Sequence, residues 1–112
     1  MKIATWNVNG IRARQAQVQE WMELEKPALL CLQEIKAAPE QVPRALLEME
    51  GYWHCWHGQK GYSGVGLHVR RDLALEAPTF SHPEFDFECR VASVDLGDLT
   101  VLSCYVPNGG KD

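Results

Sequence analysis

The pattern that most constrains the fold is a strand, a helix and a second strand within the first 34 residues. Residues 2–8 are rich in β-favouring side chains and are followed by a turn-forming Asn-Gly pair. In residues 11–26 four apolar side chains, those of Ile11, Val18, Trp21 and Met22, fall within one arc of about 100°, as in an amphipathic helix. Pro27 ends this helix, because the residue before a proline avoids helical dihedrals, and residues 28–34 form a nearly all-apolar strand.

This order of elements predicts a right-handed βαβ unit with two parallel strands. Both strands then finish at the same edge of the sheet, which is where open α/β sheets bind ligands. Asn7 and Glu34 stand at the ends of the two strands. We therefore expect their side chains to lie next to each other.

The rest of the chain extends this α/β pattern. The signals predict a short helix over residues 39–50, strands over residues 52–57, 64–70 and 73–75, and an irregular segment over residues 77–88. Only two helices are then available to cover strands that are apolar on both faces. With no repeat or linker, residues 1–112 are predicted to form a single partial domain, half of a larger fold.

A hairpin is predicted between residues 89 and 106, around the two-residue turn Gly97-Asp98. This register pairs residues on one face of the hairpin: Leu96 with Leu99, Val94 with Val101, Ala92 with Ser103, and Arg90 with Tyr105. That face is apolar near the turn and polar at its open end. A cation opposite a phenol there is a plausible anion site.

Composition excludes several classes of protein. Hydrophobic residues make up 46% of the chain, which excludes a disordered polypeptide. The net charge of −4 gives no basic field that would attract nucleic acid or membranes. The longest apolar run, residues 28–32, is too short to span a bilayer, and no signal peptide precedes it, which favours a cytoplasmic protein without membrane association. In that compartment four cysteines without a Cys-x-x-Cys motif are expected to be reduced.

Glu34 and Asn7 are the first candidate functional residues, and each has two interpretations. Glu34 could pair with Lys36, or it could bind Mg²⁺ or Mn²⁺, which favour carboxylate oxygens. Asn7 could serve only as a turn residue, or its amide could orient the ligand beside Glu34.

Tyr105 and Arg90 form the second candidate group. Tyr105 could be a packing residue, or its hydroxyl could donate to a phosphoryl oxygen while Arg90 makes bidentate contacts. Asn108 could add a further donor, although Pro-Asn-Gly is also turn composition.

The glycine-flanked loop with Lys60, Tyr62 and Ser63 fits a surface loop and a phosphate-contacting loop about equally well. A zinc site at His54 and His57 is disfavoured, because these side chains point to opposite faces of a strand and no second ligand pair follows at zinc-site spacing.

Several ordered segments of the chain closely resemble a known family. The segments are Thr5-Trp-Asn-Val-Asn-Gly-Ile-Arg12, Leu32-Gln-Glu-Ile-Lys36, Gly61-Tyr-Ser-Gly-Val-Gly66, Arg90-Val91 and Cys104-Tyr-Val-Pro-Asn108. They resemble the exodeoxyribonuclease III and abasic-site endonuclease branch of the endonuclease/exonuclease/phosphatase superfamily. The resemblance implies a four-layer α/β sandwich, of which this chain would be the N-terminal half. It also implies Mg²⁺-dependent hydrolysis of phosphodiesters in base-excision repair, by a monomer acting on abasic sites and 3′ ends of duplex DNA.

The same resemblance implies roles for individual residues. Glu34 would bind the metal ion, Asn7 would adjoin it, and Tyr105 would be the active-site tyrosine. The residues expected to contact phosphate or DNA are Arg90, Asn108, Lys60, Tyr62 and Ser63.

The family's Gly-Asp-x-Asn and Ser-Asp-His motifs do not occur in this sequence. The resemblance assigns the water-activating aspartate to that missing part, so weak or no activity is expected of this chain alone. Two alternatives stay open: a non-catalytic DNA-binding or assembly module, and a phosphoesterase of the same superfamily with a small phosphomonoester or a phospholipid headgroup as its substrate.

Overall fold

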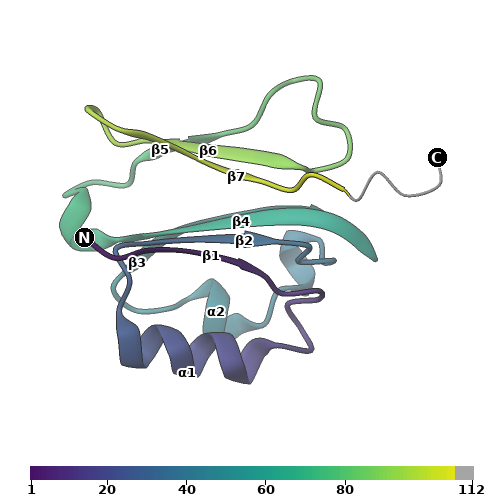
Figure 1. Ribbon diagram of the computed structural model, residues 1–112, viewed down its shortest axis with the longest axis horizontal. Coiled ribbons are helices and arrows are strands. Elements are labelled where there is room, and N and C mark those ends of the chain that lie inside the picture. The colour runs from purple at the N-terminus through teal and green to yellow at the C-terminus, as the bar shows by residue number, and fades with distance from the viewer. Residues whose placement is uncertain (108–112) are drawn as a thin grey trace.

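A computed structural model describes residues 1–107 as two facing β-sheets with helices on the outer side of one of them (Figure 1). The four-stranded sheet has the order β1-β2-β4-β3 and is made of β1 (Ile3–Asn7), β2 (Leu29–Gln33), β3 (Tyr52–Gln59) and β4 (Tyr62–Arg70). The three-stranded sheet has the order β5-β6-β7 and is made of β5 (Thr79–Ser81), β6 (Val91–Asp95) and β7 (Thr100–Cys104). The helices are α1 (Gln15–Glu25) and α2 (Arg44–Leu47), with 3₁₀ turns η1 (Pro39–Gln41) and η2 (Arg71–Leu73).

The predicted βαβ unit is present, and β1 and β2 are parallel with Asn7 opposite Gln33. The helix begins later than the sequence predicted, at Gln15 instead of residue 11. The reason is that the Ile11 N–H donates to the Ile35 carbonyl oxygen over 2.9 Å, so the chain continues alongside the residues that follow β2 before it turns. The helix ends as expected just before Pro27.

Three other predicted boundaries were wrong. The helix expected over residues 39–50 is divided into η1 and α2, which fits the position of Pro43, since the residue before a proline avoids helical dihedrals. Residues 73–75 do not form a strand, because η2 occupies residues 71–73. The segment 77–88, expected to be irregular, contains β5, which pairs with β6.

The hairpin register is confirmed. Val94 is opposite Val101 and Ala92 is opposite Ser103, and the Tyr105 N–H donates to the Arg90 carbonyl oxygen over 2.8 Å. The shared face points toward the four-stranded sheet, where Ala92, Val94 and Ser103 are buried.

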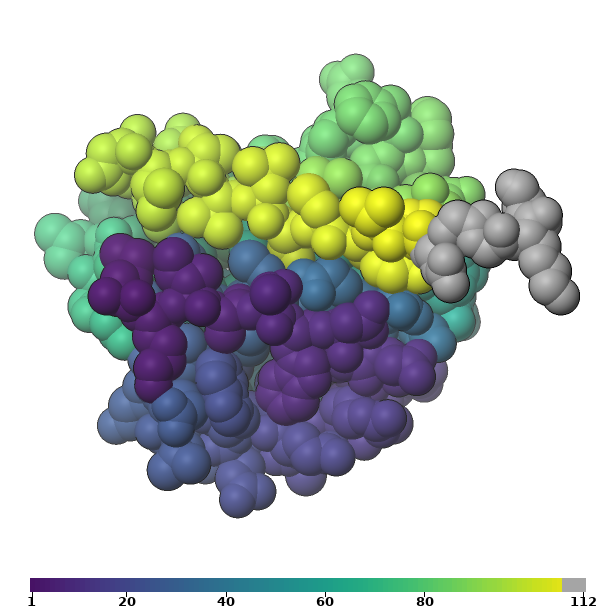
Figure 2. All heavy atoms as spheres, viewed as in Figure 1, coloured from purple at the N-terminus to yellow at the C-terminus, as the bar shows by residue number. Residues whose placement is uncertain are grey.

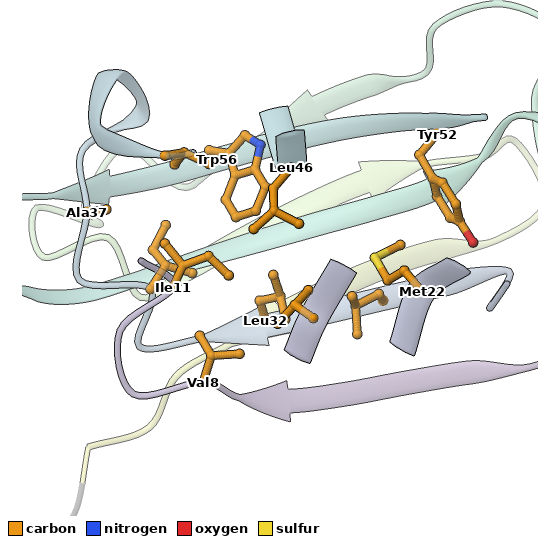
Figure 3. Packing of buried hydrophobic residues seen from close by; sticks show 12 residues of the cluster. Val8, Ile11, Met22, Leu32, Ala37, Leu46, Tyr52 and Trp56 are labelled. Carbon is orange, nitrogen blue, oxygen red and sulfur yellow. The ribbon is translucent and has the colours of Figure 1, made fainter. Parts of the chain in front are cut away.

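Two hydrophobic clusters cover both faces of the four-stranded sheet. One lies between the sheet and the helices, and Figure 3 shows Met22 and Leu46 from the helix layer meeting Leu32 and Trp56 from the strands. The other fills the space between the two sheets, and its buried members are Leu29, Cys31, Val65, Leu67, Val69, Ala92 and Val94. The apolar β2 sequence therefore alternates between two cores, as a doubly covered strand should.

The four cysteines are free thiols, as the sequence predicted. None of the helices in residues 1–107 is both long and apolar enough to cross a membrane.

The packing of the two sheets brings several strand ends together. Ser103 of β7 donates its hydroxyl hydrogen to the Leu32 carbonyl oxygen (3.0 Å) and accepts a hydrogen bond from Gln33 Nε2 (3.3 Å), so β7 lies over β2. The strands β1, β2 and β7 all finish at the right-hand end of the molecule in Figure 1. The antiparallel β4 begins at that end.

Candidate active site

The side chains of Asn7 and Glu34 meet at the shared end of β1 and β2. Asn7 Nδ2 donates to Glu34 Oε1 over 2.9 Å, and Asn7 Oδ1 accepts the Asn9 backbone N–H over 3.1 Å. The Glu34 side chain is 23% exposed, so one part is held by the protein while another part can reach a ligand. The predicted juxtaposition of these two residues is confirmed.

A lysine and a second asparagine complete this cluster. Lys36 Nζ lies 3.6 Å from Glu34 Oε2 and donates to Asn9 Oδ1 over 2.6 Å. The ion pair that was one interpretation of Glu34 is therefore present, together with the contact to Asn7. Sequence reasoning did not identify Asn9, which it treated only as part of a turn.

The backbone around this cluster is strained. Four of the six non-glycine residues with positive φ in residues 1–107 lie here: Asn9 (46°), Glu34 (53°), Lys36 (53°) and Ser63 (54°). Such a conformation costs about 1–3 kcal/mol per residue and persists only where the surroundings enforce it. Here the Gly10 N–H donates to the Glu34 carbonyl oxygen (2.8 Å) and the Lys36 N–H donates to the Ser63 carbonyl oxygen (2.9 Å). The strain fixes the direction of the polar side chains at this end of the sheet.

The loop residues predicted to contact phosphate are only partly gathered at the site. Ser63 is buried and adjoins Lys36 through the backbone hydrogen bond, while the neighbouring Tyr62 is 53% exposed. Lys60 is exposed in a turn much tighter than expected, because β3 and β4 continue until Gln59 pairs with Tyr62.

Arg90 and Tyr105 line an open pocket of about 500 Å³ beside the end of β7. The Arg90 guanidinium forms an ion pair with Glu88, while its Nε is buried without a hydrogen-bond partner in the described part of the chain. Arg90 and Tyr105 therefore lie at the open end of the hairpin, as predicted, but the Glu88 carboxylate already contacts the Arg90 guanidinium. Asn108 lies outside the described residues.

The donor set at Asn7 and Glu34 determines which cation could bind there. Residues 1–107 contain no group of three or more His, Cys, Asp or Glu side chains able to hold a metal ion. A cation at this site would have a Glu34 carboxylate oxygen and water as ligands, with Asn7 beside it holding the carboxylate through Nδ2. Mg²⁺ keeps several waters and is often bound through only one or two carboxylates, so these residues fit it.

The structure is a two-sheet α/β sandwich, and its Asn7 and Glu34 side chains meet at the carboxyl ends of parallel strands, which is where α/β proteins bind their ligands. The chain belongs to the Endonuclease/Exonuclease/phosphatase family, which matches residues 4–109. It is 37% identical to exodeoxyribonuclease III of Haemophilus influenzae, over 97% of this chain and 42% of the relative. It is 34% identical to the DNA repair nuclease APEX1 of Danio rerio, over 99% of this chain and 37% of the relative.

Solved structures give the same fold. An AP endonuclease from Archaeoglobus fulgidus matches 96% of this chain and 41% of its own, with a TM-score of 0.79 and 35% identity. The 3′-5′ exonuclease NExo from Neisseria meningitidis matches 97% of this chain and 43% of its own, with a TM-score of 0.80 and 36% identity. The family and fold expected from the sequence motifs are thereby confirmed, and the chain spans about two fifths of the length of these relatives.

Proposed function

We propose that this chain supplies the metal- and phosphate-binding half of a Mg²⁺-dependent DNA phosphodiesterase that acts at abasic sites and 3′ ends of duplex DNA. The observation that carries the proposal is the hydrogen bond between Asn7 and Glu34 at the shared end of two parallel strands. The names of the relatives, an exodeoxyribonuclease and a DNA repair nuclease, support DNA as the substrate class.

Glu34 and Asn7 are the residues that would hold Mg²⁺ or Mn²⁺. When bound, a divalent cation stabilises negative charge on a phosphoryl group. Asn7 keeps the Glu34 carboxylate oriented through its amide hydrogen bond. Lys36 offsets the Glu34 charge and has a positive charge of its own to offer to a phosphate.

The phosphate would be contacted by residues from both sheets. The Tyr105 hydroxyl can donate a hydrogen bond to a phosphoryl oxygen, and Arg90 can offer its guanidinium from the same pocket. Ser63, Tyr62, Lys60 and Asn108 are the further proposed contacts. Because the net charge is −4, we expect modest affinity for DNA that weakens as salt increases.

The reaction also requires a group that accepts the proton of the attacking water. The Gly-Asp-x-Asn segment to which the family resemblance assigns this role does not occur in the sequence. We therefore predict that these 112 residues, incubated with Mg²⁺ and a duplex containing an abasic site, give little or no strand cleavage. Robust turnover that depends on Glu34 would contradict this expectation.

Binding tests the rest of the proposal. The affinity for an abasic-site duplex, measured at two salt concentrations, should fall with salt and should fall further in Arg90→Ala. Binding that is absent, or indifferent to Arg90, would reject the proposed phosphate contacts. Salt-sensitive binding without any cation bound at Glu34 would favour a non-catalytic binding module instead.

A second candidate activity is removal of a 3′ phosphate from DNA. One similar structure, of NExo from Neisseria bound to a product DNA hairpin, is named as a 3′ phosphatase. A screen of phosphate release from DNA 3′ ends, small phosphomonoesters and phospholipid headgroups, run with the chain in excess, distinguishes this candidate from the phosphodiesterase.

A further inference from the structure

The segment between β5 and β6 is fastened by one carboxylate. Both oxygens of Asp86 accept the Arg90 backbone N–H, at 2.8 and 3.0 Å, and Oδ2 also accepts the Val91 N–H at 2.9 Å. His57 Nε2 lies 2.9 Å from the same Oδ2. Asp86 therefore joins β3 of one sheet, which contains His57, to the start of β6 in the other.

This carboxylate is charged although it is hardly accessible to water. The Asp86 side chain is 6% exposed and that of His57 is 15% exposed. Burial acts to raise the pKa of Asp86, but the hydrogen bonds from Arg90, Val91 and His57 hold the pKa below its usual value. A buried carboxylate with this many donors is a rigid anchor, because every bond is charge-assisted.

The anchor fixes the residue from which the guanidinium extends. The Arg90 N–H is held by Asp86, and the Arg90 carbonyl oxygen accepts the Tyr105 N–H over 2.8 Å. With both of its peptide groups held, Arg90 has a fixed Cα–Cβ direction toward the pocket that it lines with Tyr105. His57 is itself held against the ring of His82, stacked at 4.1 Å between centroids and 11° between planes.

We propose that Asp86, supported by His57, is a positioning residue that aims Arg90 at a DNA phosphate. The inference rests on the proposed function, in which Arg90 contacts that phosphate. Asp86 itself does not touch the phosphate, because its oxygens are occupied by the backbone of Arg90 and Val91 and by the His57 ring.

The direction in which Asp86→Asn changes the affinity for DNA distinguishes a positioning role of Asp86 from a general effect of net charge. Asp86→Asn removes a negative charge from an acidic protein, which by itself would strengthen binding to DNA. If Asp86 positions Arg90, the same change weakens binding instead. Asp72→Asn is the matched control, because Asp72 is exposed, pairs with Arg70 at the opposite end of β4, and carries the same charge.

The test is a double-mutant cycle on binding of the full 112-residue chain to a duplex with a tetrahydrofuran abasic-site analogue, at low salt. We expect Arg90→Ala to weaken binding about tenfold and Asp86→Asn about three- to tenfold. In the Arg90→Ala background, Asp86→Asn should have no further effect, and Asp72→Asn should not weaken binding in either background. Equal loss from Asp86→Asn with and without Arg90 would overturn the inference.

A second pair of variants covers the case in which Asp86→Asn folds poorly. His57→Gln keeps a donor for Asp86 and should bind DNA nearly as well as the unmodified chain, whereas His57→Phe should lose about threefold, again only when Arg90 is present. Identical affinities for the two His57 variants would contradict the supporting role of His57. If Arg90→Ala itself changes nothing, the phosphate contact of Arg90 in the proposed function fails and this inference fails with it. If Arg90→Ala weakens binding and Asp86→Asn does not, only the positioning role fails.

Discussion

At the scale of single residues, Glu34 combines two roles that the sequence presents as alternatives. One carboxylate oxygen accepts the Asn7 amide, and the other lies near the Lys36 ammonium group. The ion pair with Lys36 does not close the site, since an exposed ion pair contributes only about 0–1 kcal/mol and exchanges readily for a stronger ligand. Pairing with Lys36 and binding of a cation are therefore compatible.

His68 is a residue whose charge affects stability. It is fully buried in β4, and the centroid of its ring lies 4.9 Å from that of Trp56. Burial, with a smaller contribution from the charge of His54, lowers the pKa of His68 from 6.5 to about 3. The unfolded chain therefore binds a proton that the folded chain does not between these pH values.

We predict that the free energy of unfolding contains a His68 contribution that is complete above about pH 6.5 and decreases as the pH falls toward 3. The loss has a limiting slope of about 1.4 kcal/mol per pH unit, because one proton is taken up on unfolding. Urea unfolding between pH 7.5 and 5 measures the slope, and His68→Phe should remove this part of it. A variant with an unchanged pH dependence would contradict the assignment.

At the scale of elements, the start of β4 depends on a glycine. Gly64 has a φ of +92°, and a Cβ there would lie 2.5 Å from Ile35 Cγ1. Its carbonyl oxygen accepts the Ile35 N–H (3.2 Å) and its N–H donates to the Cys89 carbonyl oxygen (3.0 Å). Gly64 thus links Ile35, the residue after Glu34, to Cys89, the residue before Arg90.

Gly64→Ala should therefore destabilise the fold by about 3 kcal/mol or more, because a methyl group meets a packed side chain in a backbone region that alanine disfavours. The matched control is Gly61→Ala, with a similar φ of +86° and no atom within 4 Å of the added Cβ. It should cost only about 1 kcal/mol. Equal unfolding midpoints in urea for the two variants would contradict the importance of the Ile35 contact.

How much of the site the sequence could predict depends on the kind of information required. The parallel pairing of β1 with β2 and the hairpin of β6 with β7 follow from hydrophobic pattern and chain connectivity, so Asn7 beside Glu34 and Ala92 opposite Ser103 were predictable. The contact between Lys36 and Asn9 was not, because it depends on left-handed backbone angles at non-glycine residues. Asp86 was missed for a related reason, since its donors are backbone groups, which carry no signature in the sequence.

At the scale of the whole molecule, the described residues form a helix layer and two sheets, and one open edge of each sheet lies on the same side. β1 and β7 are edge strands, and β7 packs over β2, so both edges face one side of the sandwich, where Figure 2 shows them close together in purple and yellow. Exposed edges of this kind can accept further strands. Relatives with more than twice this chain length have ample polypeptide to cover such a face.

The central claim is that Asn7 and Glu34 hold a divalent cation where two parallel strands end. Crystals of the chain soaked in Mn²⁺ test it directly through anomalous diffraction. We expect one anomalous peak within about 2.0–2.5 Å of a Glu34 carboxylate oxygen, adjoining Asn7, that disappears in isostructural crystals of Glu34→Gln. A peak that persists in that variant, or a Mn²⁺ ion bound elsewhere with none at Glu34, would contradict it.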